Sequence, residues 1–512
     1  MRTVIVGAGA AGAVIAARLT EDASHDVLLL EAGPDYPFAS ESPETLPEDL
    51  RNGRRNSMKA HDWGYDYQAT DHPVWGRIQR MRFPRGRVVG GSSAVNTCIA
   101  LRGQPADYDE WAALGLPEWS WEKCLPAFKR LEHDCDHDNE WHGQDGPIPI
   151  RRHTPDELVP YQAAFLEACA ELGFPRSVDS NDPTTTGAGP HAMNKINGER
   201  MSTARCYLTG AVRARPNLTV KPHTVVRRVL FENRHARGVE VESHGRVTTI
   251  KADRVVLAGG AIATPGILLR SGVGPEADVL RVGARLVADV PGVGAQLLDH
   301  PGIVIILQAL HAGYVDVEAP IIQTHCRYTS EGSSCPNDVQ LQPGSFVPLP
   351  DHPLRLLPLA ACIGKPVSRG RLRFTSARPS DEPRIETALL ADGRDREMAR
   401  EAMRWISRLL QTKALSAVVR PIYPSRKPFD GNGDLRSAIE QVTGSGYHPS
   451  GTVPMGPERD PRAATDGRGR VRGVRGVYVA DASLMPTIPS ANTHLPTVMI
   501  GERFGEWLRE SD

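Results

Sequence analysis

The N-terminal segment TVIVGAGAAGAVIAARL constrains the fold of this chain more than any other feature. It reads as a short β-branched strand, then glycines at positions 7, 9 and 12, then an apolar helix. Without side chains, Gly7 could form a tight turn, Gly9 could approach a pyrophosphate, and Gly12 could pack close to the sheet. A second strand, DVLLLEAG, carries Glu31 about 20 residues further on, where an acid can accept hydrogen bonds from ribose hydroxyls.

The order strand, glycine triplet, helix, strand and acid predicts a dinucleotide-binding βαβ unit. The helix N-terminus would present unpaired N–H groups and a positive dipole end to the phosphates. A glycine triplet alone fits a simple glycine-rich turn equally well, but the full ordered pattern favours a nucleotide site. The pattern does not distinguish NAD from FAD.

Composition limits the remaining function classes. The chain has 512 residues, of which 40% are hydrophobic and 24% are charged, so we expect two or more globular domains. The formal net charge of −1 gives no electrostatic reason to expect nucleic acid or a membrane surface as a partner. The longest apolar runs, such as VVLAGGAIA, are too short for a membrane span. Eight scattered cysteines without a C-x-x-C pair predict reduced, mostly buried thiols in the cytoplasm. The apolar strand that begins within three residues of Met1 leaves no room for a secretory leader, so we expect none.

The middle of the chain changes character along its length. Residues 217–258 show short alternating strands and end in a second buried strand, RVVLAGG, followed by a helix with Pro265 near its start. Residues 303–462 alternate strand-like segments with proline-rich loops and include the long helix DREMAREAMRWISRLLQ. The last stretch returns to a buried strand, GVYVADASLMP, and an amphipathic helix. We therefore expect a nucleotide domain that is discontinuous in sequence and a second domain with antiparallel strands.

Two segments between residues 104 and 143 have weaker signals. DYDEWAALGLPEWSWEKCLPAFKRLE predicts short amphipathic helices divided at Pro117 and Pro126, with its aromatic residues in the core. HDCDHDNEWHG gathers three histidines and a cysteine near carboxylates, which could bind a metal ion. Its spacing matches no standard metal site, so we interpret it as a solvated loop and predict no metal.

Six ordered motifs span almost the whole chain and together resemble the glucose–methanol–choline (GMC) oxidoreductase family. They are the N-terminal triplet with Glu31, GRVVGGSSAVN, GAIATPGILLRSGVGP, GVGAQLLDHP, HPSGTVPMG and VADASLMPTIPSANTHLPT. Within the family, ADYDEWAALG and the segments after it are most similar to bacterial hydroxymethylfurfural oxidases, pyridoxine oxidases and mycofactocin-associated members. The resemblance implies FAD rather than NAD. It also implies an α/β plus α+β fold with a Rossmann-like FAD-binding domain (residues 1–150, 198–302 and 463–512) and a substrate domain built on an antiparallel sheet (residues 151–197 and 303–462).

The resemblance also assigns roles to individual residues. Alcohol oxidation removes a hydroxyl proton as well as a hydride, and a histidine is suited to take that proton because its ordinary pKa is near neutrality. His448 matches the family's catalytic base and His494 matches a second catalytic position that holds the substrate oxygen, while Tyr447 would border the substrate. The residues implied for cofactor binding are Gly7, Gly9, Gly12, Glu31, Ala32, Val88, Gly91, Asn96, Thr97, Val226, Asp481, Ala482 and Pro496.

The resemblance leaves several alternatives open. Some relatives attach FAD through a histidine just before the asparagine of the second motif, but this chain has Val95 there, so we expect non-covalent FAD. The predicted activity is oxidation of a primary alcohol, with aromatic or heteroaromatic alcohols as leading substrates. Oxygen or another acceptor could receive the electrons. Non-alcohol chemistry on the same fold and a non-enzymatic FAD-binding role are the alternatives.

Overall fold

The computed structural model describes residues 1–57, 59–70, 79–347, 355–426 and 435–510. Its first layer is a five-stranded sheet in which every neighbouring pair of strands is parallel. Both faces of this sheet are covered, which explains why its strands are continuous apolar runs. In spatial order the strands are β10 (Leu218–Lys221), β2 (Asp26–Leu30), β1 (Arg2–Val6), β14 (Arg254–Leu257) and β25 (Val477–Val479).

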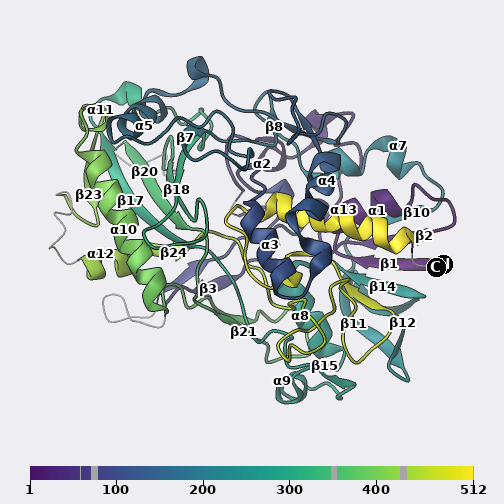
Figure 1. The fold of residues 1–512 in the computed structure, drawn as a ribbon. Helices are drawn as coiled ribbons and strands as arrows, with labels where there is room; N and C mark the ends of the chain where they lie inside the picture. The colour runs from purple at the N-terminus through teal and green to yellow at the C-terminus, as the bar shows by residue number, and fades with distance from the viewer. Residues whose placement is uncertain (58, 71–78, 348–354, 427–434, 511–512) are drawn as a thin grey trace.

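Helices cover one face of the parallel sheet and a β-meander covers the other (Figure 1). The helices are α1 (Gly12–Leu19), α4 (Trp121–Leu131) and α13 (His494–Glu510). The meander is formed by β11 (Val225–Glu232), β12 (His235–Ser243) and β13 (Arg246–Lys251), with α8 (Gly260–Arg270) beside it. Gly501 lets α13 approach α1 closely, because a Cβ atom there would lie 2.9 Å from the Cβ of Val14.

A seven-stranded antiparallel sheet forms the second half of the molecule. Its order is β23 (Val419–Tyr423), β17 (Pro301–Ala309), β20 (Leu356–Ile363), β19 (Val339–Pro343), β18 (Thr324–Tyr328) and β7 (Gly187–Pro190), and β24 (Thr443–Ser445) also pairs with β17. Figure 1 shows the long helix α10 (Gly393–Leu410) lying across this sheet, with α5 (Pro160–Glu171), α11 (Lys413–Ser416) and α12 (Leu435–Val442) nearby.

The strands of the antiparallel sheet have two different faces. Ile303, Ile305 and Leu307 on β17 are fully buried in a second hydrophobic core, whereas Val304 between them is exposed. Strand β20 alternates in the same way, with the fully buried Leu359 and half-buried neighbours. One face therefore packs against the helices, and the other remains open toward the parallel sheet.

Smaller elements connect these layers. A four-stranded sheet contains β21 (Arg371–Arg373), β22 (Arg384–Glu386), β3 (Asp66–Gln68) and β4 (Arg80–Arg82). Two-stranded pairs are β5 (Glu132–Asp134) with β6 (Ile148–Ile150), β8 (Lys195–Ile196) with β9 (Glu199–Arg200), and β15 (Val273–Gly274) with β16 (Ala288–Asp289). The remaining helices are α2 (Glu48–Arg51), α3 (Pro105–Ala113), α6 (Thr203–Tyr207), α7 (Gly210–Arg213) and α9 (Glu276–Arg281).

The expected mixed α/β fold, with one parallel and one antiparallel sheet, is confirmed. The predicted helix break at Pro126 is wrong, because α4 continues through it. Proline there removes one hydrogen bond in the middle of the helix, and burial of Ala127, Phe128 and Leu131 offsets that loss. The eight cysteines are all free, and five of them are buried as predicted. Within the described ranges, no helix combines the length and apolarity that crossing a bilayer requires.

Candidate active site

A cavity of about 520 Å³ lies between the carboxyl ends of the parallel strands and the open face of the antiparallel sheet. Of the residues predicted from the sequence, most line this cavity: Gly7, Gly9, Glu31, Ala32, Gly91, Asn96, Thr97, Val226, Tyr447, His448, Asp481, Ala482 and His494. Gly12, Val88 and Pro496 do not line it. Ligands of open parallel sheets bind at this edge, so the position suits a nucleotide.

The glycine-rich turn between β1 and α1 has separate roles for its three glycines. Gly7 has a left-handed backbone with φ of 99°, and a Cβ atom at Gly12 would lie 1.9 Å from the carbonyl oxygen of Gly7. Gly12 therefore serves packing, as the sequence predicts. Gly9 has open space, since the nearest atom to an added Cβ would be the Cα of Gly91 at 3.8 Å. Its backbone is therefore exposed to the cavity with no side chain over it.

Glu31 closes the nucleotide end of the cavity. Its carboxylate is buried and accepts hydrogen bonds from the backbone N–H groups of Ala8 at 3.1 Å and Gly33 at 2.8 Å. Burial raises the pKa of Glu31 to about 7, although these hydrogen bonds act in the opposite direction. A carboxylate has about four lone-pair sites, so Glu31 can still accept from two hydroxyl groups of a sugar.

A second glycine pair presses against the first turn. Gly90 has φ of 103° and donates its N–H to the carbonyl of Ala8 at 2.7 Å. A Cβ atom at Gly91 would lie 2.8 Å from the Cα of Gly9, so the second turn tolerates no side chain at position 91. Val88 is fully buried in a small apolar cluster behind this loop, which places it in the wall of the site and not on its surface.

Asn96 and Asp481 organise the loops on either side of the cavity. The side-chain oxygen of Asn96 accepts from the N–H of Cys98 at 2.8 Å, so this residue shapes its own loop while lining the cavity. Asp481 is buried and accepts from the N–H of Gly260 at 2.8 Å and from the hydroxyl of Thr264 at 2.7 Å. It thereby joins the end of β25 to the N-terminus of α8.

Asp299 holds the loop that carries His448. One of its carboxylate oxygens accepts from the N–H groups of His300 and His448, both at 2.9 Å, and the other accepts from the hydroxyl of Ser445. Tyr447 adopts a left-handed backbone with φ of 65°, and Arg85 donates to its carbonyl at 2.8 Å. A tyrosine in this conformation costs of the order of 1 kcal/mol, and these contacts keep it there.

The His448 imidazole faces the cavity with both ring nitrogens in contact. Its Nε2 lies 3.1 Å from the amide nitrogen of Asn492, and its Nδ1 lies 2.9 Å from Nδ1 of His300. Burial lowers the pKa of His448 well below its ordinary value, and the neighbouring His300 and Arg85 lower it further. The imidazole is therefore neutral near pH 7 and has a lone pair that can accept a proton.

His494 borders the same cavity as the first residue of α13. Its Nε2 atom is buried and has no hydrogen-bond partner within the described ranges. Burial lowers the pKa of His494 to about 4, so this imidazole is also neutral. A buried polar atom without a partner is costly, which indicates that a ligand atom completes it.

The open face of the antiparallel sheet forms the opposite wall. Its side chains are uncharged: Val304, Gln340, Gln342, Ala360 and Cys362 line the cavity, together with Ile321 and Ile322 from the preceding loop. The amide of Gln340 donates to the side-chain oxygen of Gln342 at 2.8 Å. Sequence reasoning missed this wall, and also missed Asp299, His300 and Asn492. The motif GVGAQLLDHP contained the signal for the first two of these three residues.

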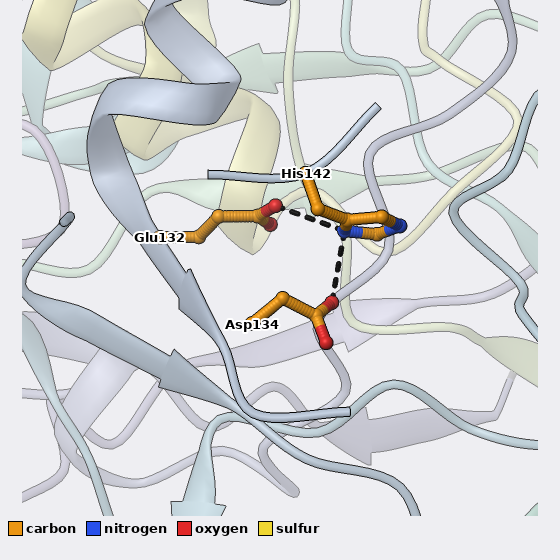
Figure 2. A group of neighbouring side chains, drawn as sticks. All are labelled: Glu132, Asp134 and His142. Carbon is orange, nitrogen blue, oxygen red and sulfur yellow. Dashed lines mark hydrogen bonds and ion pairs between the residues drawn. The ribbon is translucent and has the colours of Figure 1, made fainter. Parts of the chain in front are cut away.

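The segment HDCDHDNEWHG is not simply a solvated loop, and that interpretation is wrong for two of its residues. Asp134 and His142 are buried beside Glu132, as Figure 2 shows. Nδ1 of His142 lies 3.0 Å from Glu132 and 2.9 Å from Asp134, and its Nε2 lies 2.8 Å from Asp179. The three side chains in Figure 2 could hold a metal ion by proximity alone.

Two arginines complete this buried cluster. Arg102 pairs with Glu132, and Arg152 pairs with Asp134 at 2.9 Å and with Asp179. Burial by itself would lower the pKa of His142, but its hydrogen bonds to Asp134, Asp179 and Glu132 outweigh burial and raise the pKa to about 10. Three carboxylates thus face three cations. This balance makes the cluster a structural ion-pair network.

Comparisons with known proteins identify the family to which this chain is similar. Two family models, both described as GMC oxidoreductase, match residues 1–302 and 366–501. An oxygen-dependent choline dehydrogenase of Chromohalobacter salexigens is 35% identical over 99% of this chain and 95% of its own length. A 5-(hydroxymethyl)furfural oxidase of Methylovorus sp. is 34% identical over 98% of this chain and 97% of its own. The crystal structure of pyridoxine 4-oxidase from Mesorbium loti superimposes with a TM-score of 0.90 at 29% identity, covering 100% of this chain and 99% of that one.

Proposed function

The chain belongs to the glucose–methanol–choline oxidoreductase family, and from this premise we propose that it oxidises a neutral primary alcohol to the aldehyde with non-covalently bound FAD. One observation carries the proposal. His448 and His494 border the same cavity as the nucleotide turn of Gly7 and Gly9. A proton acceptor and an oxygen-holding group thus lie beside a site for a dinucleotide.

The residues of the cavity fit FAD. Backbone without side chains at Gly7 and Gly9 would hold the pyrophosphate, and Glu31 would accept from the ribose. Asn96, Thr97 and Ala482 line the far end, where the ring system would lie. Bound FAD would supply the hydride acceptor for the reaction. Val95 lines the cavity and has no nucleophilic atom, which supports non-covalent binding.

The two imidazoles have different roles toward the substrate hydroxyl. His448 is neutral and accepts the hydroxyl proton at Nε2, the nitrogen beside Asn492. His494 donates a hydrogen bond to the oxygen as negative charge grows there, and the positive N-terminal end of α13 supports that charge. General-base assistance of this kind contributes about 10²–10⁴-fold to the rate.

The uncharged sheet wall favours a neutral substrate. In the described part of the chain, the carboxylates bordering the cavity are Glu31, Asp381 and Asp481. Glu31 lies at the nucleotide end, Asp481 is bound to α8, and Asp381 pairs with Arg378 at 3.0 Å. A quaternary ammonium group beside His448 would therefore lack an anionic partner. Apolar side chains with two glutamine amides suit an aromatic or heteroaromatic ring.

We also propose the domain division. Residues 1–150, 198–302 and 463–512 would form a Rossmann-like FAD-binding domain, and residues 151–197 and 303–462 would form the substrate domain. The strands of the parallel sheet come from the first set, and those of the antiparallel sheet come from the second set to within two residues. Eight unpaired cysteines support a reducing, cytoplasmic location.

An anaerobic alcohol screen tests the function. Purified holoenzyme is mixed with benzyl alcohol, hydroxymethylfurfural, pyridoxine or choline, and bleaching of the flavin absorbance is followed before air is readmitted. We expect bleaching with at least one neutral alcohol and weaker bleaching with choline, while recolouring in air identifies oxygen as an acceptor. His448→Ala should bind FAD but lose at least ~10²-fold in the reduction rate. The matched variant His311→Ala alters an exposed histidine outside the cavity and should behave as wild type. Normal reduction in His448→Ala would reject the assignment.

A further inference from the structure

His300 contacts the proposed base at its Nδ1 atom and borders the same cavity. It precedes β17, is 1% exposed, and places its ring against that of His448 with centroids 5.0 Å apart at 74°. The two Nδ1 atoms lie 2.9 Å apart. Two ring nitrogens at this distance share one proton, because two N–H groups would repel and two lone pairs would not bond.

The second nitrogen of His300 decides which ring carries that proton. Nε2 of His300 lies 3.0 Å from the backbone carbonyl of Pro489. A carbonyl only accepts, so this nitrogen bears a hydrogen. Burial lowers the pKa of His300 to about 4, and the ring is neutral with a single N–H. Its Nδ1 consequently carries a lone pair and no hydrogen. In the hydrogen bond between the two rings, Nδ1 of His448 must therefore be the donor.

We propose that His300 is a positioning residue that fixes His448 in the tautomer protonated on Nδ1, so that Nε2 presents its lone pair to the substrate. The inference rests on the proposed function, in which His448 is the base. Asn492 agrees with it, since its amide nitrogen faces Nε2 at 3.1 Å as a donor to a lone pair would. Nε2 has a single lone pair, so the substrate hydroxyl must replace this amide as the donor before the proton is transferred. A backbone carbonyl at Pro489 thus determines, through two rings, which atom can accept a proton.

The proton balance of the step follows directly. The substrate O–H bond breaks, its electron pair stays on oxygen, and a new N–H bond forms at Nε2 of His448. The imidazolium then keeps its Nδ1–H bond to the lone pair of His300, which becomes a charge-assisted hydrogen bond. His300 itself gains and loses no proton. Without this acceptor, the His448 proton could move to Nε2, and that nitrogen could then no longer accept the substrate proton.

Nitrogen NMR of the holoenzyme tests the tautomer without any mutation at His300. The protein is labelled with ¹⁵N-histidine, and the His448 signals are those missing from His448→Ala. We expect a protonated Nδ1 and an unprotonated Nε2 for His448. A protonated Nε2 on His448 would overturn the inference.

Two variants supply the kinetic test. His300→Phe removes the acceptor and should lower the limiting rate of flavin reduction by roughly 10- to 100-fold without weakening substrate binding, because a wrong tautomer disables a catalytic histidine. His300→Asn retains an oxygen acceptor and should stay within about 5-fold of wild type. Equal, wild-type rates in both variants would overturn the proposal. If no alcohol bleaches the flavin but the NMR pattern is as expected, the proposed function fails and the tautomer assignment stands. If an alcohol bleaches the flavin but Nε2 of His448 is protonated, the proposed function stands and the tautomer assignment fails.

Discussion

Replacing Asp299 should detach the His448 loop while leaving the nucleotide site intact. The Asp299 carboxylate accepts from three donors, the N–H groups of His300 and His448 and the hydroxyl of Ser445. Asp299→Ala leaves all three donors buried without an acceptor. Asp299→Asn is the matched control, because its amide oxygen can accept both N–H bonds and its NH₂ group can donate to the Ser445 hydroxyl.

The size of the effect can be worked out from these bonds. Each buried donor left without a partner costs about 1–3 kcal/mol, and partial hydration of the opened loop reduces the sum to about 2–4 kcal/mol. At about 1.4 kcal/mol per tenfold change, the opening equilibrium of the loop should rise by roughly 30- to 700-fold. A displacement of the base by about 1 Å should in addition lower the rate of flavin reduction by about 10²-fold.

Hydrogen–deuterium exchange of the peptide that spans residues 443–448 measures the loop opening, and stopped-flow flavin reduction measures the chemical step. In Asp299→Ala, exchange should accelerate by the stated factor and flavin reduction should slow, while FAD content stays normal. Asp299→Asn should change each quantity by less than about tenfold. If Asp299→Ala exchanges and reduces like wild type, Asp299 does not hold the loop.

Four further predictions follow from the same contacts. Precipitating the denatured protein should release the yellow colour into the supernatant, because Val95 cannot bond to the flavin; a coloured pellet contradicts this. Flavin reduction should keep a constant rate from about pH 6 to about pH 9, because burial already keeps the pKa of His448 below this range; a tenfold rise centred between about pH 6 and 7 would contradict it. His142→Gln should lower the free energy of unfolding by about 3–5 kcal/mol at pH 7 in urea titrations. The pKa of His142 is raised to about 10 in the folded protein, so the stabilisation it provides is complete below about pH 6.5 and is lost as the pH rises through about 10. The free energies of unfolding of the variant and the wild type should therefore converge near that pH. An equal difference between them at pH 7 and at pH 10.5 would count against the ion-pair network. Gln342→Glu should raise the ratio of kcat/KM for choline over benzyl alcohol by roughly tenfold, and an unchanged ratio would place Gln342 outside the substrate site.

The nucleotide half of the site was predictable because its signals are local. Strand, glycines, helix and acid follow one another within about 30 residues, and steric exclusion at Gly7 and Gly12 leaves few other conformations. The same motif also predicted the separate roles of Gly9 and Gly12. In the structure Gly9 is bare toward the cavity, whereas Gly12 packs against the turn.

The contacts around His448, the proposed base, were not predictable from the residues near it. His300 meets His448 across 148 positions of sequence, and its role depends on a carbonyl at Pro489, which no side-chain pattern records. The error at His142 has the same origin. Its third carboxylate, Asp179, and the balancing arginines lie on other segments, so the local sequence looked like a hydrated loop.

Alternation along the antiparallel strands separates the residues proposed to determine substrate selectivity from those that stabilise the fold. Ile303 and Ile305 anchor β17 to the helices behind it, while Val304 between them contributes only to the chamber in front. Gln340 on β19 and Ala360 on β20 likewise line the cavity, and the residues on either side of each are buried. Substitutions at every second position of these strands, in evolution or in a mutant library, can therefore change which alcohol is accepted with little loss of fold stability.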